Sequence, residues 1–345
     1  MTKLDPIALT RQLVDIESTT YQEGAVGHFL ADFLGSRGFL VETTHVPPPP
    51  GSTAERLNVY AAAGPEPPVV VLSTHMDTVP PFLPSSEDAD YLYGRGSCDA
   101  KGIVAAQVAA AEQLRERGVM VGLLFVVGEE RDSAGARMAN LHPRGSRFLI
   151  NGEPTDNRLC LVSKGVLRAA LTAHGRMAHS AYPELGESAI NKLIHALYRV
   201  LALPLPAEEG IGPSTLNIGL IEGGRAPNVI ADQASAQLLI RLVGPSEATR
   251  AAIEAAAAPD VEVDFNLEIP FLRLQAAELF PDLPTMIAAF TTDVPELSAW
   301  GQPLLLGPGS IHVAHTPHER LAKRELFEAI DLYVRIAEHL TRLPG

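Results

Sequence analysis

Several acidic and imidazole side chains that could bind metals or transfer protons follow apolar runs or lie in open loops. They are His75 in LSTHMDTVPP, Asp99 in GRGSCDAKG, Glu129 and Glu130 in VVGEER, Glu153 in NGEPT and His315 in GPGSIHVAHTP. Imidazoles and carboxylates are ligands for divalent metals, zinc above all, with cobalt or manganese as alternatives. If the adjacent pair Glu129 and Glu130 supplies one ligand, the set has five, which exceeds what one open catalytic zinc needs and favours two metals that share one bridging carboxylate.

Each of these residues taken alone has a plainer interpretation. A histidine or aspartate at a strand end usually caps a turn, and adjacent glutamates usually form a solvated face. Glu129 and Glu130, however, follow a run of mostly apolar residues that predicts a buried strand, where acids are costly unless something offsets their charge. Because neighbouring side chains on extended backbone point apart, one carboxylate can bind a metal while the other reaches a water.

Other catalytic chemistries find less support in the sequence. There is no Gly-x-Ser-x-Gly motif, and GRGSCDAKG has neither the dinucleotide-binding spacing nor the Walker spacing of glycines. Cys98 beside Asp99 could be proposed as a nucleophile, but a small buried thiol next to a turn is the favoured interpretation. With Cys160 it makes only two cysteines, which excludes a disulfide framework and favours a reducing cytoplasm.

The elements that must position these residues form an alternating pattern. Apolar runs at residues 68–75, 119–127 and 147–151 predict buried strands, and the alanine-rich stretch 100–117 predicts a helix between two of them. Strands that alternate with helices indicate a largely parallel sheet, which binds ligands at the carboxyl ends of its strands. His75, the pair Glu129 and Glu130, and Glu153 lie at those ends.

A second domain is predicted inside the first. Residues 163–272 show the order strand, helix, strand, strand, helix, strand, which is typical of a ferredoxin-like sandwich. We therefore assign residues 1–162 and 273–345 to a larger domain that this one interrupts. The last part is expected to add a helix near 283–290, a strand in QPLLLG and a helix at 324–340.

Composition narrows the classes of function. The 345 residues carry a formal net charge of −14 and no basic run, which argues against a nucleic-acid-binding surface. No apolar run is long enough to predict a membrane span, and the first residues lack the apolar core of a secretory signal.

Five motifs together resemble a known family. STHMDTVP, GRGSCDAKG, GEER, NGEPT and GPGSIHVAHTPHE follow the order and rough intervals of the M20-type dinuclear zinc metallopeptidases and deacylases, which include acetylornithine deacetylase, succinyl-diaminopimelate desuccinylase and acetyl-lysine deacetylase. The resemblance covers essentially the whole chain. It implies an α/β zinc-peptidase-like catalytic domain with a mostly parallel sheet, and an inserted ferredoxin-like βαββαβ domain that acts as a lid or in dimerisation.

The resemblance also implies a ligand set for two divalent metals. His75 and Glu153 would bind one ion, Glu130 and His315 the other, and Asp99 would bridge them. Zinc is the expected metal, with cobalt or manganese as alternatives.

Three further residues receive catalytic roles from the resemblance. Asp77 would orient the imidazole of His75, which its i+2 spacing on extended backbone allows. Glu129 would be the general base that takes a proton from the metal-bridging water and delivers it to the leaving amine. His179, in the Ala-His-Ser segment of the inserted domain, would donate to the oxyanion, often in the partner subunit's site; its alternative is a surface turn.

Substrate contacts are predicted by the same resemblance. Asn228 and Arg241 would hold the substrate's carboxylate, and the backbone at Gly309 would allow close approach to a ligand. Asn228 as a turn residue and Arg241 as a strand-face charge are the alternatives. Ser310 stands where relatives usually have an aspartate, which is expected to alter loop contacts without removing a ligand.

The expected activity is hydrolysis of an N-acyl amino acid, of the N-acetylornithine or N-acetyl-lysine type, in arginine or lysine biosynthesis. A glutamate at position 153 goes, within the family, with deacylases and carboxypeptidases. One alternative is the release of lysine or ornithine from an acidic carrier protein, although a charge of −14 is an unfavourable docking surface for it. Others are a carboxypeptidase or dipeptidase, and a binding protein without activity, against which the complete ligand set argues. A cytoplasmic homodimer through the inserted domain is also expected.

Overall fold

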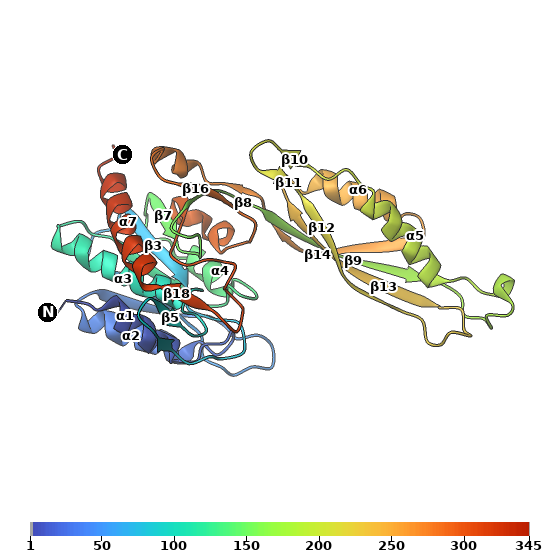
Figure 1. The fold of residues 1–345 in the computed structure, drawn as a ribbon, viewed down its shortest axis with the longest axis horizontal. Helices are drawn as coiled ribbons and strands as arrows, with labels where there is room; N and C mark the ends of the chain where they lie inside the picture. The colour runs from blue at the N-terminus through green and yellow to red at the C-terminus, as the bar shows by residue number, and fades with distance from the viewer. Residues whose placement is uncertain (1–2, 345) are drawn as a thin grey trace. The chain divides into compact units, whose positions relative to one another are not determined.

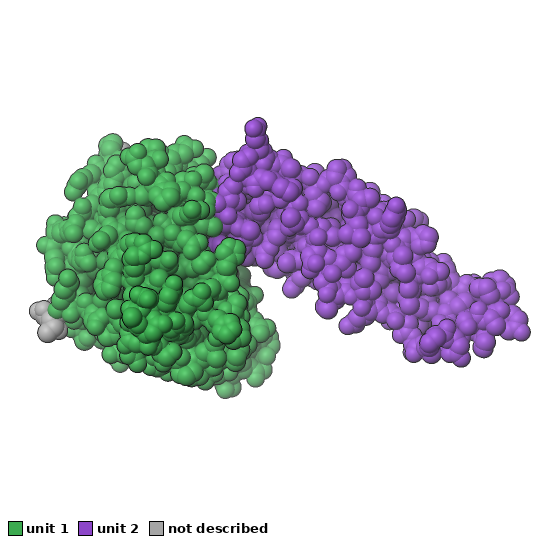
Figure 2. Space-filling view, in the orientation of Figure 1, with its two compact units in different colours: residues 1–161, 274–286, 292–345 green, residues 162–273, 287–291 purple. Residues whose placement is uncertain are grey.

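The computed structural model describes residues 3–344, which belong to two compact units (Figure 2). Unit 1 contains Met1–Leu161, Leu274–Met286 and Thr292–Gly345, and unit 2 contains Val162–Arg273 and Ile287–Thr291. The boundaries predicted from the sequence differ from these by one residue at each crossing, and the prediction assigns 287–291 to the larger domain.

The central sheet of unit 1 has six strands in the order β1-β2-β6-β3-β7-β17. These are β1 (Leu40–His45), β2 (Leu57–Ala62), β6 (Gly122–Val126), β3 (Val70–His75), β7 (Phe148–Asn151) and β17 (Gln302–Leu305). The α/β class is confirmed, but the sheet is mixed. Strands β6, β3, β7 and β17 pair in parallel, whereas β1, β2 and β6 pair antiparallel. Because the proline-rich loop between β1 and β2 holds no crossover helix, the chain returns antiparallel there.

Both faces of this sheet are covered. Leu72 and Ile150 belong to the core shared with helices α1 (Pro6–Val14), α2 (Gly24–Ser36), α3 (Lys101–Glu116) and α7 (Lys323–Thr341), and Figure 1 shows α3 and α7 beside the sheet. The alternate residues Val71 and Leu149 belong to a second core with α4 (Ala134–Asn140) and η3 (Val294–Trp300). This period-two alternation explains why the strands read as continuous apolar runs.

A small sheet fixes the loop that carries Asp99. It has the order β18-β5-β4 and consists of β4 (Ser86–Glu87), β5 (Tyr91–Tyr93) and β18 (Arg320–Ala322). Helix α3 begins directly after this loop, and its small alanine side chains let most of its residues be buried. The loop is therefore anchored at both ends.

Unit 2 has the predicted βαββαβ order. It contains β9 (Gly165–His174), α5 (Ala189–Leu201), β12 (Thr215–Gly223), β13 (Gln233–Leu242), α6 (Glu247–Ala257) and β14 (Val261–Ile269), besides η1 (Pro183–Leu185) and the hairpin β10 (Ala207–Glu208) and β11 (Gly212–Pro213). The antiparallel order β12-β13-β9-β14 is that of a ferredoxin-like sandwich. Figure 1 shows α5 and α6 along this sheet, and their apolar side chains share its core.

The helix expected near residues 283–290 is wrong. The structure has the strand β16 (Thr285–Ala288) there, in a sheet of order β15-β8-β16 with β15 (Leu272–Arg273) and β8 (Leu159–Ser163). Pro284 lies inside the expected helix and cannot continue a helical hydrogen-bond pattern. A short helix, η2 (Gln275–Leu279), precedes the strand. Among residues 3–344, no helix is long and apolar enough to cross a membrane.

Candidate active site

The candidate site lies at the carboxyl ends of three neighbouring parallel strands of unit 1. His75 is the last residue of β3, Glu129 and Glu130 follow β6, and Glu153 follows β7. Since β3 lies between β6 and β7 in the sheet, the ends of these strands bring the four side chains to one edge.

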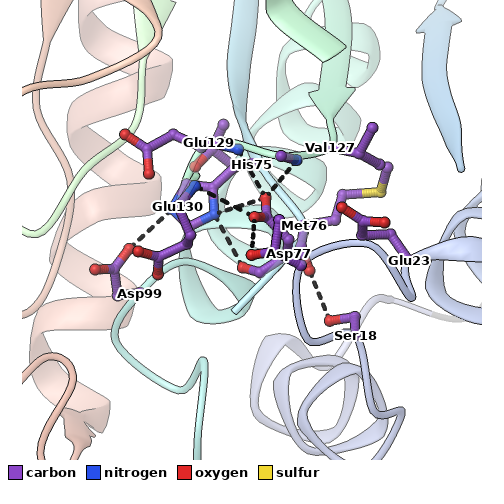
Figure 3. Close-up of polar contacts among 12 residues, drawn as sticks. Ser18, Glu23, His75, Met76, Asp77, Asp99, Val127, Glu129 and Glu130 are labelled. Carbon is purple, nitrogen blue, oxygen red and sulfur yellow. Dashed lines mark hydrogen bonds and ion pairs between the residues drawn. The ribbon is translucent and has the colours of Figure 1, made fainter. Parts of the chain in front are cut away.

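Asp99 joins the two histidines of the site. Its Oδ1 lies 2.9 Å from Nε2 of His75, and its Oδ2 lies 3.4 Å from Nε2 of His315. Nε2 of His315 also lies 3.0 Å from Oε1 of Glu130. Ligand atoms of His75, Asp99 and Glu130 lie within 4.8 Å of one another, and Figure 3 shows these side chains together. One carboxylate that faces two imidazoles has the arrangement expected of a bridging ligand.

Three glutamates add carboxyl groups to the site; Glu153 is buried, and Glu129 and Glu130 are half-buried. Burial is the largest cause that raises the pKa of Glu129, Glu130 and Glu153, and for Glu129 the charge of Glu153 raises it further. Glu153 is 4% exposed, and its Oε1 has no hydrogen-bond partner among residues 3–344. Buried acids with an unused oxygen are unfavourable unless a cation offsets them, so the residues present fit a site for divalent metals.

The acids of the site raise the pKa values of the two imidazoles. Hydrogen bonds to Asp99 and Glu130 raise the pKa of His315 to about 10. Burial alone would lower the pKa of His75, but hydrogen bonds to Asp77 and Asp99 raise it well above its ordinary value. Without metal, both imidazoles therefore hold a proton tightly. A histidine must release this proton before its nitrogen can bind a metal ion.

Asp77 anchors the loop of the two glutamates. Its Oδ1 accepts hydrogen bonds from the amides of Gly128 (2.9 Å) and Glu129 (3.1 Å), and its Oδ2 accepts from the amide of Glu130 (3.3 Å) and the Thr20 hydroxyl (2.8 Å). The nearest partner of His75 Nδ1 is the Asp77 backbone carbonyl at 3.0 Å, and the carboxylate lies at 3.5 Å. The expected contact with His75 is therefore shared by carbonyl and carboxylate, and the loop contacts were not foreseen.

The two glutamates point in different directions. Figure 3 shows the Glu129 carboxylate directed away from that of Glu130, which lies toward Asp99. Glu129 therefore lies outside the group formed by His75, Asp99 and Glu130. This position agrees with a role for Glu129 other than metal binding.

Several charged residues behind the site were missed by sequence reasoning. Arg56 and Glu23, both fully buried, form an ion pair at 3.1 Å beneath the glutamate loop, where a Cβ at Gly128 would meet Arg56 Nη2 at 2.3 Å. Asp293 is also buried, and burial raises its pKa to about 7. None of these side chains ends an apolar run or repeats at a fixed interval, so no sequence pattern singles them out.

Cys98 and Gly309 contact one another. The Cys98 thiol is buried, which raises its pKa well above the ordinary value, so the interpretation as an unreactive thiol is favoured over a nucleophile. Gly309 has φ +83°, and a Cβ there would lie 2.6 Å from Cys98 Sγ. The close approach expected at Gly309 is thus made by this cysteine.

The other predicted site residues lie in unit 2. His179 and Asn228 are exposed neighbours, since the Ser180 amide donates to the Asn228 carbonyl at 3.0 Å. Arg241, on β13, is half-buried, and burial lowers the pKa of its guanidinium. Within the described part of the chain Arg241 has no ion-pair partner.

Known proteins resemble this chain over most of its length. A sequence profile described as peptidase family M20/M25/M40 matches residues 71–339. An M20 domain-containing protein of Schizosaccharomyces pombe is 39% identical, with 97% of this chain and 85% of that protein covered. A protein of Aspergillus terreus named "Probable carboxypeptidase" is 40% identical, with coverage of 96% and 86%.

Solved structures share the fold. A tripeptidase from Staphylococcus aureus has a TM-score of 0.81 and 22% identity, with 98% of each chain covered. A Bacillus subtilis protein described as a dinuclear metal-binding peptidase of family M20 has a TM-score of 0.68 and 18% identity, with 98% of each chain covered. The resemblance carried by the five motifs is thus confirmed by sequence identity and fold together: the chain belongs to peptidase family M20/M25/M40 and is a hydrolase of that family.

Proposed function

We propose that the chain hydrolyses the amide bond of an N-acyl amino acid, of the N-acetylornithine or N-acetyl-lysine type, in arginine or lysine biosynthesis. Hydrolysis is supported by the Asp99 carboxylate. One of its oxygens contacts the His75 imidazole and the other contacts the His315 imidazole. The choice of an acyl amino acid is supported by the glutamate at position 153, which the family resemblance associates with deacylases and carboxypeptidases.

The proposal includes two divalent metal ions, zinc first, with cobalt or manganese as alternatives. His75 and Glu153 would hold one ion, Glu130 and His315 the other, and Asp99 would contact both. When bound, such ions lower the pKa of water toward neutrality and polarise the scissile carbonyl.

Glu129 is the proposed general base. Its carboxylate diverges from that of Glu130, and its pKa is raised by burial, so it can accept a proton from the attacking water and return it to the leaving amine. Asp77 holds the Glu129 amide at 3.1 Å and thereby limits where this carboxylate can lie.

Residues of unit 2 are proposed to recognise the substrate. The His179 imidazole is exposed and free to donate to an oxyanion, and Asn228 beside it would bind the carboxylate of the amino acid with Arg241. The half-buried Arg241 guanidinium has N–H donors that no acid within residues 3–344 occupies. Such donors could form a bidentate bond to a substrate carboxylate. Gly309 of unit 1 would contribute backbone contacts.

A cytoplasmic homodimer through unit 2 is also proposed. Helix α5 exposes Ile194, Tyr198 and Leu201 at helical spacing, with Tyr198 76% exposed. Strand β12 is an edge strand that exposes Leu220 and Ile221. Apolar side chains on a helix and an unpaired edge strand favour association. The solution mass, by light scattering, should be twice that of one chain; a monomer at micromolar concentration would contradict this.

A carboxypeptidase or dipeptidase activity is the second candidate. The names of similar proteins support this candidate. The Aspergillus terreus protein is named a probable carboxypeptidase, and a protein of similar fold from Saccharomyces cerevisiae is described as a di-peptidase. Both activities cleave an amide next to a free carboxylate, so the same residues would serve. Release of lysine or ornithine from an acidic carrier protein is disfavoured by the charge of −14.

A turnover screen separates these candidates. N-acetyl, N-succinyl and peptidyl derivatives of ornithine, lysine, citrulline and diaminopimelate would be tested with zinc and with cobalt. We expect the highest kcat/KM for N-acetylornithine or N-acetyl-lysine. A peptidyl substrate cleaved ten times more efficiently than any N-acetyl amino acid would overturn the deacetylase assignment in favour of the carboxypeptidase.

A further inference from the structure

A buried glutamate of unit 1 holds the loop that carries Asp99. Oε1 of Glu319 accepts hydrogen bonds from the amides of Gly96 at 2.8 Å, Asp99 at 3.2 Å and Cys98 at 3.3 Å. Glu319 is 1% exposed. A carboxylate oxygen that receives three backbone N–H groups fixes their relative positions, because each would otherwise be left without a partner inside the protein.

Strand pairing explains how residues so far apart in the chain meet. The Asp99 loop follows β5 and Glu319 directly precedes β18, and these strands pair antiparallel with Arg320 opposite Tyr93. The amide of Gly94 also donates to the Glu319 carbonyl at 3.3 Å. Backbone and side chain of Glu319 thus bind the same loop.

The second oxygen of Glu319 binds a buried arginine. Arg95 Nη1 donates to Oε2, and Arg95 Nε donates to the Pro81 carbonyl at 3.4 Å. Arg95 is 2% exposed, so its charge offsets that of Glu319 without water. Pro81 belongs to the segment that follows His75 and Asp77, so the pair connects two segments that bear site residues.

Glu319 also lies four residues after His315. The intervening chain is a compact turn in which the Thr316 hydroxyl donates to the Val313 carbonyl at 2.7 Å and the Glu319 amide donates to the Thr316 carbonyl at 3.4 Å. The residue that holds the Asp99 backbone is therefore part of the segment that presents His315.

We propose that Glu319 is a positioning residue that fixes the backbone of the loop carrying Asp99. Held in this way, the Asp99 carboxylate presents one oxygen to His75 and the other to His315. Glu319 does not contact substrate, and it acts on the metal centre only through the Gly96–Asp99 backbone. This inference rests on the proposed function in one respect, that Asp99 is a metal ligand.

Zinc binding by the metal-free protein tests the proposal without any substrate. Glu319→Ala removes all the side-chain contacts, whereas Glu319→Gln keeps the shape and loses the charge. We expect zinc to bind Glu319→Ala about 10- to 100-fold more weakly than wild type, measured by competition with a chromophoric chelator, as for other residues that orient metal ligands. Glu319→Gln should shift zinc affinity in the same direction by a smaller factor, and it serves alone if Glu319→Ala does not fold.

Glu112→Gln is the matched control. Glu112 forms a bidentate pair with Arg37 between α3 and α2, and its side chain is 11% exposed, but no site residue contacts it. This variant should lose stability to urea and keep wild-type zinc affinity. If the Glu319 variants likewise lose stability but bind zinc within threefold of wild type, Glu319 has only a structural role and the proposal is wrong.

The wild-type protein separates this proposal from the proposed function. Wild type that binds zinc but cleaves none of the tested amides overturns the substrate assignment and leaves the Glu319 comparison intact. Wild type that binds no zinc overturns the metal centre itself, and with it the role of Glu319.

Discussion

His75 and Asp99 of unit 1 are buried and contact one another, whereas His179 and Asn228 of unit 2 are exposed and contact mainly nearby backbone. The first pair is held by a network that reaches Asp77, Glu319 and the ends of three strands. In the second pair, His179 lies in the segment between β9 and η1, and Asn228 lies in the turn between β12 and β13. Unit 1 therefore has the preorganisation that chemistry needs, and unit 2 has the accessible polar groups that recognition needs.

A similar contrast exists within unit 1. The His75 side chain is 1% exposed and that of His315 is 48% exposed, although both contact Asp99. His75 ends a central strand, whereas His315 lies in a loop with φ +64°. Solvent therefore reaches the His315 side chain but not that of His75.

The largest expected effect comes from Glu129, the proposed base in unit 1. Glu129→Gln keeps the shape of the side chain but cannot accept a proton, so kcat should fall about 10³-fold. Zinc affinity should stay within threefold, because Glu129 lies outside the proposed ligand set. Glu328→Gln, on the exposed surface of α7, is the control. Steady-state kinetics on the best substrate checks this, and turnover within tenfold of wild type would show that Glu129 is not the base.

The next largest effect is expected in unit 2. His179→Ala should lower kcat about 10²-fold through loss of an oxyanion donor. Because His179 is exposed, the midpoint of urea unfolding should not change, in contrast to any substitution of His75. An unchanged kcat would mean that His179 is a surface turn residue and that unit 2 takes no part in the chemical step.

Arg241→Met tests recognition more narrowly. Loss of the guanidinium should raise KM about 10- to 100-fold for substrates with a free carboxylate, with a smaller change in kcat. The matched control is Arg168→Met, on the neighbouring strand β9, where the exposed Arg168 binds Asn266. If both substitutions raise KM equally, the change in KM comes from disturbance of the sheet, and Arg241 does not bind the substrate carboxylate.

The smallest effect is expected on stability. Chelation should lower the melting temperature by about 5 °C or more, since a bound metal stabilises the folded state. The apo protein should also lose stability as pH rises from 6 to 9. Glu129 and Glu153 have folded pKa values above their unfolded values, and so does His315, so each group binds its proton more tightly when folded. The stability they contribute at low pH is lost as pH rises through the folded pKa.

The pH dependence has its own control. Zinc-loaded protein should show a flatter melting temperature over the same range, because the ligands are already deprotonated. Parallel curves for apo and zinc-loaded protein in differential scanning calorimetry would contradict the assignment of Glu153 and His315 as metal ligands.

The sequence predicted what depends on local pattern. The strands β3, β6 and β7 are apolar runs, and His75, Glu129 and Glu153 stand out because each follows such a run. The order of elements in unit 2 was equally readable, because each strand and helix has its own period. The helix predicted at 283–290 is wrong because Pro284 cannot continue a helix, although the apolar residues around it fit helical spacing.

What could not be predicted are contacts between distant parts of the chain. Glu319 and Gly96 are 223 residues apart, and their hydrogen bond depends on the pairing of β5 with β18. Arg56 and Glu23 are fully buried, although charged residues in isolation predict exposure. Such side chains give no periodic signal, because their burial is compensated by partners that only the fold brings near.

The central claim is that the unit 1 cluster around Asp99 holds two metal ions. The most direct measurement is the zinc content of wild type and Asp99→Ala after both are stripped, reloaded and desalted. We expect two zinc ions per wild-type chain and fewer than one in the variant, with both proteins folded by circular dichroism. Wild type that holds no zinc, or a variant that retains both ions, would contradict it.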